Sequence, residues 1–342
     1  MIHSGAGMKV AVVGAGSIGG FLGARLALAG EEVTFVARGA NLEAISRQGF
    51  KLIEEDGEER IADSVKAVAI KDATPQDVVL LALKAHQVAA VAPDLHRLCG
   101  PETSIVTLQN GIPWWYFFKL GGPYEGRPVR SADPDGSIAA HIDNRRIIGT
   151  VVYPASELTA PGVVRVIEGN RFTLGEPDGS KSERVQTLSD ALTRAGFKAP
   201  IAADLRAEIW MKLWGNVVFN PVSALSHATL AGICGFAPTR ALAAEMMAET
   251  QAVAEKLGVR FRISIDKRIA GAEAVGEHKT SMLQDVEAGR PLELEALVGS
   301  VVEMARLTET PTPHIDAIYA VTALLAKQMA AVKGRLEIQT ID

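Results

Sequence analysis

The sequence predicts an α/β Rossmann-type dinucleotide-binding domain followed by an all-α domain. An apolar run at Lys9 to Val13 precedes a glycine-rich turn, and a helical pattern and a second strand pattern, Val33 to Ala37, come next. After Asp204 the strand patterns almost vanish and long helical patterns begin. The chain of 342 residues is long enough for two cores. We therefore expect a nucleotide-binding domain over residues 8–203 and a helical substrate and catalytic domain over residues 204–342.

The first domain shows strand patterns that alternate with helical or loop segments, which favours a mostly parallel sheet covered by helices. These strand patterns are Val65 to Ala69, Val78 to Leu83 and Ser104 to Leu108. Shorter patterns punctuated by Gly and Pro are expected to add antiparallel strands to one edge of the sheet. They are Arg146 to Val152, Val163 to Ile167 and Arg171 to Leu174. A helix at Glu183 to Ala195 and a strand near Ala199 to Ala202 are expected to close the domain.

The second domain shows long apolar patterns of helical period. The helices expected there are Leu205 to His227, Ala237 to Leu257, Ile263 to Val275, Ser281 to Glu287, Pro291 to Leu307 and Ile315 to Ala331. Alanine-rich helices of this kind could support a homodimer.

Composition and charge exclude several classes of protein. Lys+Arg 35 against Asp+Glu 40 gives a net charge of -5, and no dense basic run supplies the footprint of nucleic-acid binding. Cys99 and Cys234 are too distant for a disulfide framework or a metal site, so no metal is expected. Apolar stretches such as Val78 to Leu83 fall short of the roughly 20 residues that cross a bilayer. Residues Met1 to Gly7 resemble an extension rather than a signal peptide, so we expect a cytoplasmic protein without membrane contact.

The glycine-rich turn indicates a nucleotide site. Gly14, Gly16 and Gly19 come directly after a strand pattern and open a helix, as the dinucleotide fingerprint requires. Ser17 and Ile18 begin that helix, where free N–H groups bind phosphate. The alternative is an ordinary glycine-rich turn between strand and helix.

The end of the second strand indicates the type of nucleotide. Sites that prefer NAD carry an acidic residue there, but this sequence has no carboxylate and places Arg38 where a 2'-phosphate would need a cation. NADP(H) is therefore the expected cofactor, unless Arg38 is only a surface residue. Lys84 directly follows the strand pattern Val78 to Leu83, and Asn110 with Gly111 follows the strand pattern Ser104 to Leu108. Ligands of open α/β sheets bind at such carboxyl ends of strands, although Asn-Gly can also form a simple turn.

Polar residues in the first helix of the second domain are candidates for chemistry. Lys212, Asn216 and Asn220 are spaced i, i+4, i+8 and share one face of a strongly apolar helix. Asparagine is a poor helix former and is costly to bury without a partner. The alternative is a surface pair between Glu208 and Lys212 with asparagines in a buried network.

A second polar segment spans Lys279 to Glu293. Ser281 with Gln284 has the spacing of a capping box, and a helix start is also a natural place for a substrate carboxylate. Glu293 is expected in the first turn of the helix that begins near Pro291, beside its buried face.

Taken in order, these motifs resemble the ketopantoate reductase (2-dehydropantoate 2-reductase) family along nearly the whole chain. The matching segments are Gly14 to Gly19, Arg38, Leu83 to Ala85, Gln109 to Gly111, Trp210 to Pro221, and Ser281 to Glu293. The resemblance implies a Rossmann domain joined to a helical domain, with NADPH reducing a small 2-oxo acid in pantothenate biosynthesis. It carries the catalytic lysine onto Lys212 and the active-site glutamate, which also contacts cofactor, onto Glu293. The remaining implied roles are substrate binding by Asn110, Asn216, Asn220 and Ser281, and cofactor binding by the glycine-rich turn, Arg38, Lys84 and Asn110.

The chemistry agrees with those roles. Hydride addition to a carbonyl carbon develops negative charge on oxygen, which a positioned ammonium such as that of Lys212 stabilises and then protonates. Two departures bear on the substrate. An asparagine that some members carry is replaced by the Thr229 and Leu230 region, and Trp114 to Phe118 is more aromatic than expected for ketopantoate. Because this aromatic segment follows the carboxyl end of a strand, it is expected to shape the substrate side of the cleft, unless it only anchors the following helix against the sheet or covers a dimer contact. The alternative functions are reduction of a bulkier 2-oxo acid or oxidation of a 3-hydroxy acid by the same fold. An alternative of another class is a non-catalytic protein that senses NADPH.

Overall fold

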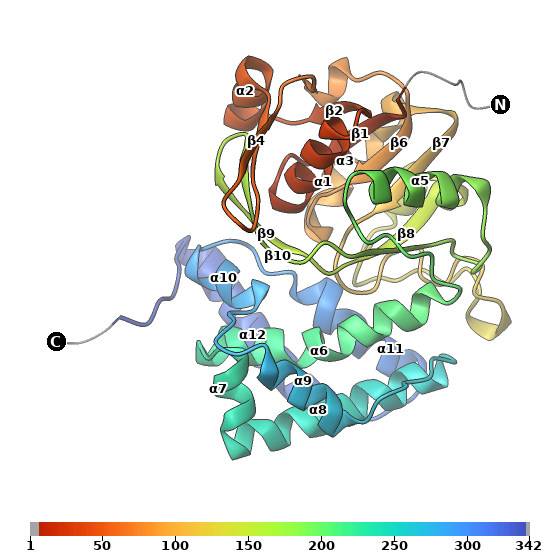
Figure 1. The fold of residues 1–342 in the computed structure, drawn as a ribbon. Helices are drawn as coiled ribbons and strands as arrows, with labels where there is room; N and C mark the ends of the chain where they lie inside the picture. The colour runs from red at the N-terminus through yellow and green to blue at the C-terminus, as the bar shows by residue number, and fades with distance from the viewer. Residues whose placement is uncertain (1–6, 340–342) are drawn as a thin grey trace. The chain divides into compact units, whose positions relative to one another are not determined.

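The computed structural model describes residues 7–339 and divides the chain into two compact units (Figure 1). Unit 1 comprises Met1–Gln109, Trp114–Pro128 and Asp133–Leu205. Unit 2 comprises Asn110–Pro113, Val129–Ala132 and Arg206–Asp342. The extension expected at Met1 to Gly7 lies, except for Gly7, outside the described residues.

Unit 1 is built on a seven-stranded sheet of order β11-β8-β7-β6-β1-β2-β5. Its strands are β1 (Lys9–Val13), β2 (Glu32–Val36), β5 (Lys66–Val68), β6 (Gln76–Leu81), β7 (Cys99–Thr107), β8 (Ile147–Val152) and β11 (Phe172–Gly175). All neighbouring strands run parallel except β11, which pairs antiparallel with β8. The interior strand β1 pairs on both sides, with β2 and β6, and is buried from Val10 to Val13, as its continuous apolar run predicts.

A second sheet of four strands lies in the same unit, with the order β4-β3-β10-β9. Its strands are β3 (Phe50–Ile53), β4 (Glu59–Ala62), β9 (Ala155–Ala160) and β10 (Val163–Glu168). The expectation that three late strands extend one edge antiparallel was thus correct only for β11, because β8 runs parallel to β7 and β10 belongs to this second sheet. The strand expected at Ala199 to Ala202 is reduced to an isolated bridge between Ile201 and Leu174. Alternation along a strand specifies its buried face but not its partner.

Helices and short turns complete unit 1. The helices are α1 (Ser17–Leu28), α2 (Gly39–Gln48), α3 (Val88–Val91), α4 (Ser137–His141) and α5 (Glu183–Arg194). The 3-10 turns are Ile70–Asp72, Ala85–Gln87, Ala92–Leu98, Gly122–Tyr124 and Asn144–Arg146. Phe21 of α1 and Phe172 of β11 both pack edge-on against Phe197, which links helix and sheet in one core.

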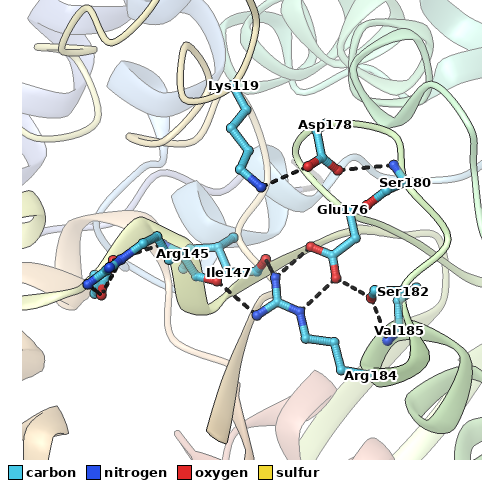
Figure 2. Close-up of polar contacts among 10 residues, drawn as sticks. Lys119, Arg145, Ile147, Glu176, Asp178, Ser180, Ser182, Arg184 and Val185 are labelled. Atoms are coloured by element: carbon cyan, nitrogen blue, oxygen red, sulfur yellow. Dashed lines mark hydrogen bonds and ion pairs between the residues drawn. The ribbon is translucent and has the colours of Figure 1, made fainter. Parts of the chain in front are cut away.

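A polar network joins β11, α5 and β8 in unit 1 (Figure 2). The Arg184 side chain donates to both carboxylate oxygens of Glu176, at 2.7 and 2.6 Å, and to the carbonyls of Arg145 and Ile147. Glu176 also accepts the hydroxyl of Ser182, the N-cap of α5. Because Glu176 is only 4% exposed, this arginine is the partner that allows a carboxylate to be buried there.

The aromatic segment Trp114 to Phe118 packs inside unit 1. Trp114, Trp115, Tyr116 and Phe117 are at most 6% exposed. The indole of Trp115 donates to Thr107 at the end of β7, and that of Trp114 donates to Asn144. A side chain at Gly149 of β8 would meet the Trp115 ring at 2.6 Å, so this strand makes room for the indole. The structure therefore favours a packing role for the segment over a substrate-pocket role.

The regular secondary structure of unit 2 is helical over its described residues (Figure 1, green to blue). Its helices are α6 (Leu205–Ser226), α7 (Leu230–Gly235), α8 (Ala237–Lys256), α9 (Ile265–Ala274), α10 (Ser281–Glu287), a π turn at Glu295–Gly299, α11 (Ser300–Leu307) and α12 (Pro313–Val332). The predicted succession of an α/β Rossmann-type domain and an all-α domain is confirmed. The short helix α7 was not predicted, and the helix expected from Pro291 begins only at Leu294.

Two short loops belong to unit 2 although their sequence neighbours belong to unit 1. The N–H of Ile112 donates to the carbonyl of Ala296 at 3.1 Å. The carboxylate of Glu303, two turns further along, accepts the N–H groups of Arg130 and Ser131 at 2.8 and 2.7 Å. These long-range hydrogen bonds anchor both loops to the helical unit.

Helix α12 bears on the expectation that no segment crosses a membrane. With a mean hydropathy of 1.4 and 17% of its apolar window buried, it is long and apolar enough to cross a membrane. No uninterrupted apolar run marks this helix in the sequence, because polar residues such as Thr322 and Lys327 divide its apolar pattern. Ile315, Thr322 and Met329 of α12 are buried, while most of its apolar window is not.

Candidate functional site

The glycine-rich turn between β1 and α1 meets the steric demands of a dinucleotide fingerprint. Gly14 has φ +104, and a side chain there would lie 2.8 Å from the carbonyl of Ala82. A side chain at Gly19 would lie 2.0 Å from the carbonyl of Gly14, so only glycine lets α1 pack this closely. Gly16, the N-cap of α1, has nothing within 4 Å of its missing Cβ. The turn is therefore tight at its first and third glycines and open at its second, where a pyrophosphate would approach.

Polar groups near this turn belong to the same unit. Arg38 is exposed and is the N-cap of α2, directly after β2. Asn41, in the first turn of α2, donates to the carbonyl of Ala15 at 3.0 Å and accepts the N–H of Gly162. Asn41, which was not predicted from the sequence, fixes the position of the glycine-rich turn relative to α2.

Lys84 and Gln109 follow adjacent parallel strands. Lys84 is half-buried after β6, and its N–H donates to the side chain of Gln87. Gln109 follows β7 and donates through Nε2 to the carbonyls of Leu81 and Leu83, at 2.7 and 2.9 Å. Its Oε1 is buried and has no hydrogen-bond partner among the described residues. A buried acceptor without a donor at the carboxyl edge of the sheet is the kind of group that a ligand satisfies.

These features fit a dinucleotide. The open position at Gly16, the free helix start at Ser17 and Ile18, and the orphaned Oε1 of Gln109 all lie in unit 1. Only the sequence motif that Gln109 shares with Asn110 could have indicated a role for this residue. The carbonyls that it bonds are distant in sequence and cannot be inferred from its neighbours.

Lys212 lies in unit 2, on α6, and is the centre of the second group of candidate residues. Its Nζ donates to Oδ1 of Asn110 at 2.6 Å. Burial lowers the pKa of this lysine from 10.5 to about 8, and the negative charge of Glu293 opposes that shift. Asn110 thus shares a unit with the lysine, while its sequence neighbour Gln109 belongs to the nucleotide-binding unit.

The asparagines on α6 differ in their surroundings. Asn216 is half-buried one turn after Lys212. Asn220 is only 4% exposed, and its Nδ2 donates to Oγ of Ser281 at 3.4 Å. The predicted stripe of one lysine and two asparagines therefore lies on α6, and its far end meets the first residue of α10.

The start of α10 corrects the capping assignment. The N-cap is Thr280, whose hydroxyl accepts the N–H of Leu283, whereas Gln284 donates to the carbonyl of Lys279. Ser281 therefore forms no capping box with Gln284. Because Thr280 and Ser281 are adjacent hydroxyl residues, the spacing rule selected the wrong one, and Ser281 Oγ contacts Asn220 instead.

Glu293 precedes the helix that was expected to contain it. Its carbonyl accepts the N–H of Leu297, and the helix begins at Leu294. The apolar face expected beside it is buried, with Leu294, Leu297, Val298, Val301 and Ala305 each at most 3% exposed.

Comparison with known proteins identifies the family. The sequence model of the family "Ketopantoate reductase PanE/ApbA" matches residues 10–114, and that of its C-terminal domain matches residues 204–326. A 2-dehydropantoate 2-reductase from Mesorhizobium japonicum is 53% identical over 320 residues, which cover 93% of this chain and 98% of the relative.

Solved structures agree with this assignment. A structural relative from Ralstonia solanacearum has a TM-score of 0.90 at 38% identity and covers 95% of this chain and 99% of its own. A 2-dehydropantoate 2-reductase from Methylococcus capsulatus has a TM-score of 0.80 at 28% identity and covers 94% of this chain and 97% of its own. The chain belongs to the ketopantoate reductase family of oxidoreductases.

Proposed function

We propose that this protein reduces 2-dehydropantoate (ketopantoate) to pantoate with NADPH, as a cytoplasmic enzyme of pantothenate biosynthesis. The observation that carries the proposal is the setting of Lys212, whose Nζ bonds to Asn110 and whose pKa is lowered to about 8. A lysine with its pKa near the working pH can give up a proton in the reaction and take it back afterwards. The name of the Mesorhizobium japonicum relative supplies the substrate.

The reaction needs a hydride and a proton. Bound NADPH supplies the hydride that adds to the keto carbon. Lys212 stabilises the negative charge that develops on the keto oxygen and then donates the proton that makes it a hydroxyl. The neutral amine regains its proton from water, and the Glu293 carboxylate favours that charged form.

The other residues bind and orient. Asn216 and Asn220 of α6 would hold the hydroxyl and carbonyl groups of the substrate, and Ser281 would bind its carboxylate. In the other unit, Gly14, Gly16, Ser17, Ile18 and Gly19 would hold the pyrophosphate of NADPH. Arg38 and Lys84 would contact its phosphate groups, and Asn110 and Glu293 its nicotinamide end. In this proposal residues 8–203 mainly serve the cofactor and residues 204–342 mainly serve the substrate, while Asn110 and Glu293 serve both.

NADPH is expected to bind more tightly than NADH, because Arg38 is exposed after β2, where a 2'-phosphate would lie. Arg38→Ala should weaken NADPH binding roughly tenfold to a hundredfold and leave NADH nearly unchanged, since a charge-assisted hydrogen bond contributes about 1.5–3 kcal/mol. Arg47→Ala, at the other end of α2, is the control. Equal binding of both cofactors by the unaltered protein would show that Arg38 has no such role.

Ketopantoate is proposed over a bulkier 2-oxo acid because Trp114 to Phe117 are buried and the indoles of Trp114 and Trp115 bond to Asn144 and Thr107 of unit 1. NADPH oxidation should be measured with 2-dehydropantoate and with aryl and branched 2-oxo acids. The highest kcat/KM is expected for 2-dehydropantoate. A higher value for an aryl 2-oxo acid would change the substrate, and NADPH binding without turnover of any acid would favour a sensor.

A homodimer is also proposed. Val321 and Leu324 of α12 are 49% and 57% exposed, which is unusual for neighbouring large apolar side chains on one helix. Burial of this face against a second copy would remove it from water.

A further inference from the structure

A π turn interrupts the helix that begins at Leu294. Over Glu295–Gly299 the N–H of Ser300 donates to the carbonyl of Glu295, five residues earlier, instead of to that of Ala296. The Glu295 carboxylate accepts the hydroxyl of Tyr319 from α12, at 2.9 and 3.1 Å. A side chain at Gly299 would lie 2.4 Å from this carboxylate, so the absence of a Cβ leaves room for it.

The π turn releases the carbonyl of Ala296 from its regular helical partner. That carbonyl accepts two other donors, the N–H of Ile112 at 3.1 Å and the hydroxyl of Ser300 at 2.7 Å. Ser300 is completely buried. A backbone acceptor inside a helix is thereby used to hold a loop that is far away in the sequence.

The loop fits against this carbonyl only because it carries a glycine. Gly111 has φ +88, and a Cβ there would lie 1.9 Å from the oxygen of Ala296 and 2.5 Å from its carbon. The next residue toward the N-terminus is Asn110, whose Oδ1 accepts the hydrogen bond from Lys212. The π turn therefore contacts the loop at Gly111 and Ile112, and the same loop contacts Lys212 through Asn110.

We propose that the π turn and Gly111 form a positioning device, in which the released Ala296 carbonyl seats the loop and so holds the Asn110 carboxamide on Lys212. Gly111 and Ser300 are positioning residues, because they act on the lysine through Asn110 and Ala296. The effect of this device on turnover rests on the proposed function, whereas the contact with Lys212 does not.

The test uses Gly111→Ala, alone and combined with Asn110→Ala. Gly111→Ala is expected to lower kcat about 10²-fold, since a displacement of about 1 Å at a reacting group has that effect. In the Asn110→Ala background the same substitution should change kcat by less than roughly threefold, because the group that it positions is already gone. Gly258→Ala is the matched control, since Gly258 has φ +90 after α8 but open space at its Cβ.

A second readout needs neither cofactor nor substrate. Acetic anhydride labelling of Lys212 as a function of pH, followed by peptide mass spectrometry, gives the pKa of its ammonium. In Gly111→Ala this pKa should fall below that of the control, because the Asn110 acceptor stabilises the charged form. A shift in labelling without turnover of any 2-oxo acid would keep the positioning role and reject the proposed function.

Two results would overturn the proposal that the π turn and Gly111 position Asn110. One is an effect of Gly111→Ala on kcat that remains undiminished in the Asn110→Ala background, and the other is a Lys212 pKa equal to that of Gly258→Ala. If Gly111→Ala does not fold, Ser300→Ala takes its place, because it removes one donor to Ala296 without a steric clash. Its expected loss of kcat is about threefold to tenfold, with the same dependence on Asn110 and the same direction of the pKa change.

Discussion

The proposed reactivity of Lys212 depends on two opposed influences on the pKa of its ammonium group. Burial disfavours its charge, and Glu293 favours it, with burial the larger effect. The outcome is a pKa of about 8, between those of an exposed lysine and a fully desolvated one. At neutral pH the group still carries the proton that ketone reduction needs.

The rate of reduction should therefore fall as pH rises through about 8, because the lysine loses its proton over that range. The reverse reaction, oxidation of pantoate, needs the neutral amine and should rise over the same range. The measurement is kcat from pH 6 to 10 in both directions. A reduction rate that stays constant to pH 10 would mean that Lys212 is not the proton donor.

Individual residues were predicted where their role follows from residue type and spacing. The first and third glycines of the nucleotide turn, Gly14 and Gly19, are of this kind, because each is required by a steric limit that the structure shows. Thr280 and Gln109 were not recognised. Thr280 competes with an adjacent serine for the same cap, and Gln109 owes its place to carbonyls of another strand.

At the scale of elements, long helices were well predicted because an apolar face of period 3.6 repeats over several turns. The strands that β8 and β10 each pair with could not be predicted, and neither could the presence of the π turn. Strand partners are selected by contacts that are distant in sequence, and a π turn adds only one residue to an otherwise regular pattern.

The junction of β11, α5 and β8 depends on Glu176 (Figure 2). Glu176→Ala should lower the free energy of unfolding by about 1.5–3 kcal/mol, because Arg184 loses a charge-assisted partner. Lys119→Ala, which removes the exposed pair with Asp178, should cost less than about 1 kcal/mol. Urea denaturation of both variants checks the difference. Equal losses would mean that burial of Glu176 does not matter.

At the scale of the whole molecule, the residues proposed for cofactor binding and the proposed catalytic lysine fall in two different compact units. The nucleotide turn belongs to unit 1 and Lys212 to unit 2, and the short loop from Asn110 to Pro113 carries an active-site candidate from one to the other along the chain. The sequence predicted two domains as two contiguous segments. It could not reveal the loops that join the helical unit, because single hydrogen bonds to Ala296 and Glu303 hold them there.

The central claim is that Lys212 is the proton donor for hydride reduction of a 2-oxo acid. Lys212→Met keeps most of the side-chain volume and removes the ammonium, and Lys267→Met, on the exposed surface of α9, is its control. The most direct measurement is kcat of Lys212→Met with 2-dehydropantoate, together with the Kd for NADPH. We predict that kcat falls about 10² to 10⁴-fold while the Kd changes less than roughly threefold. A kcat equal to that of the unaltered protein would contradict the account.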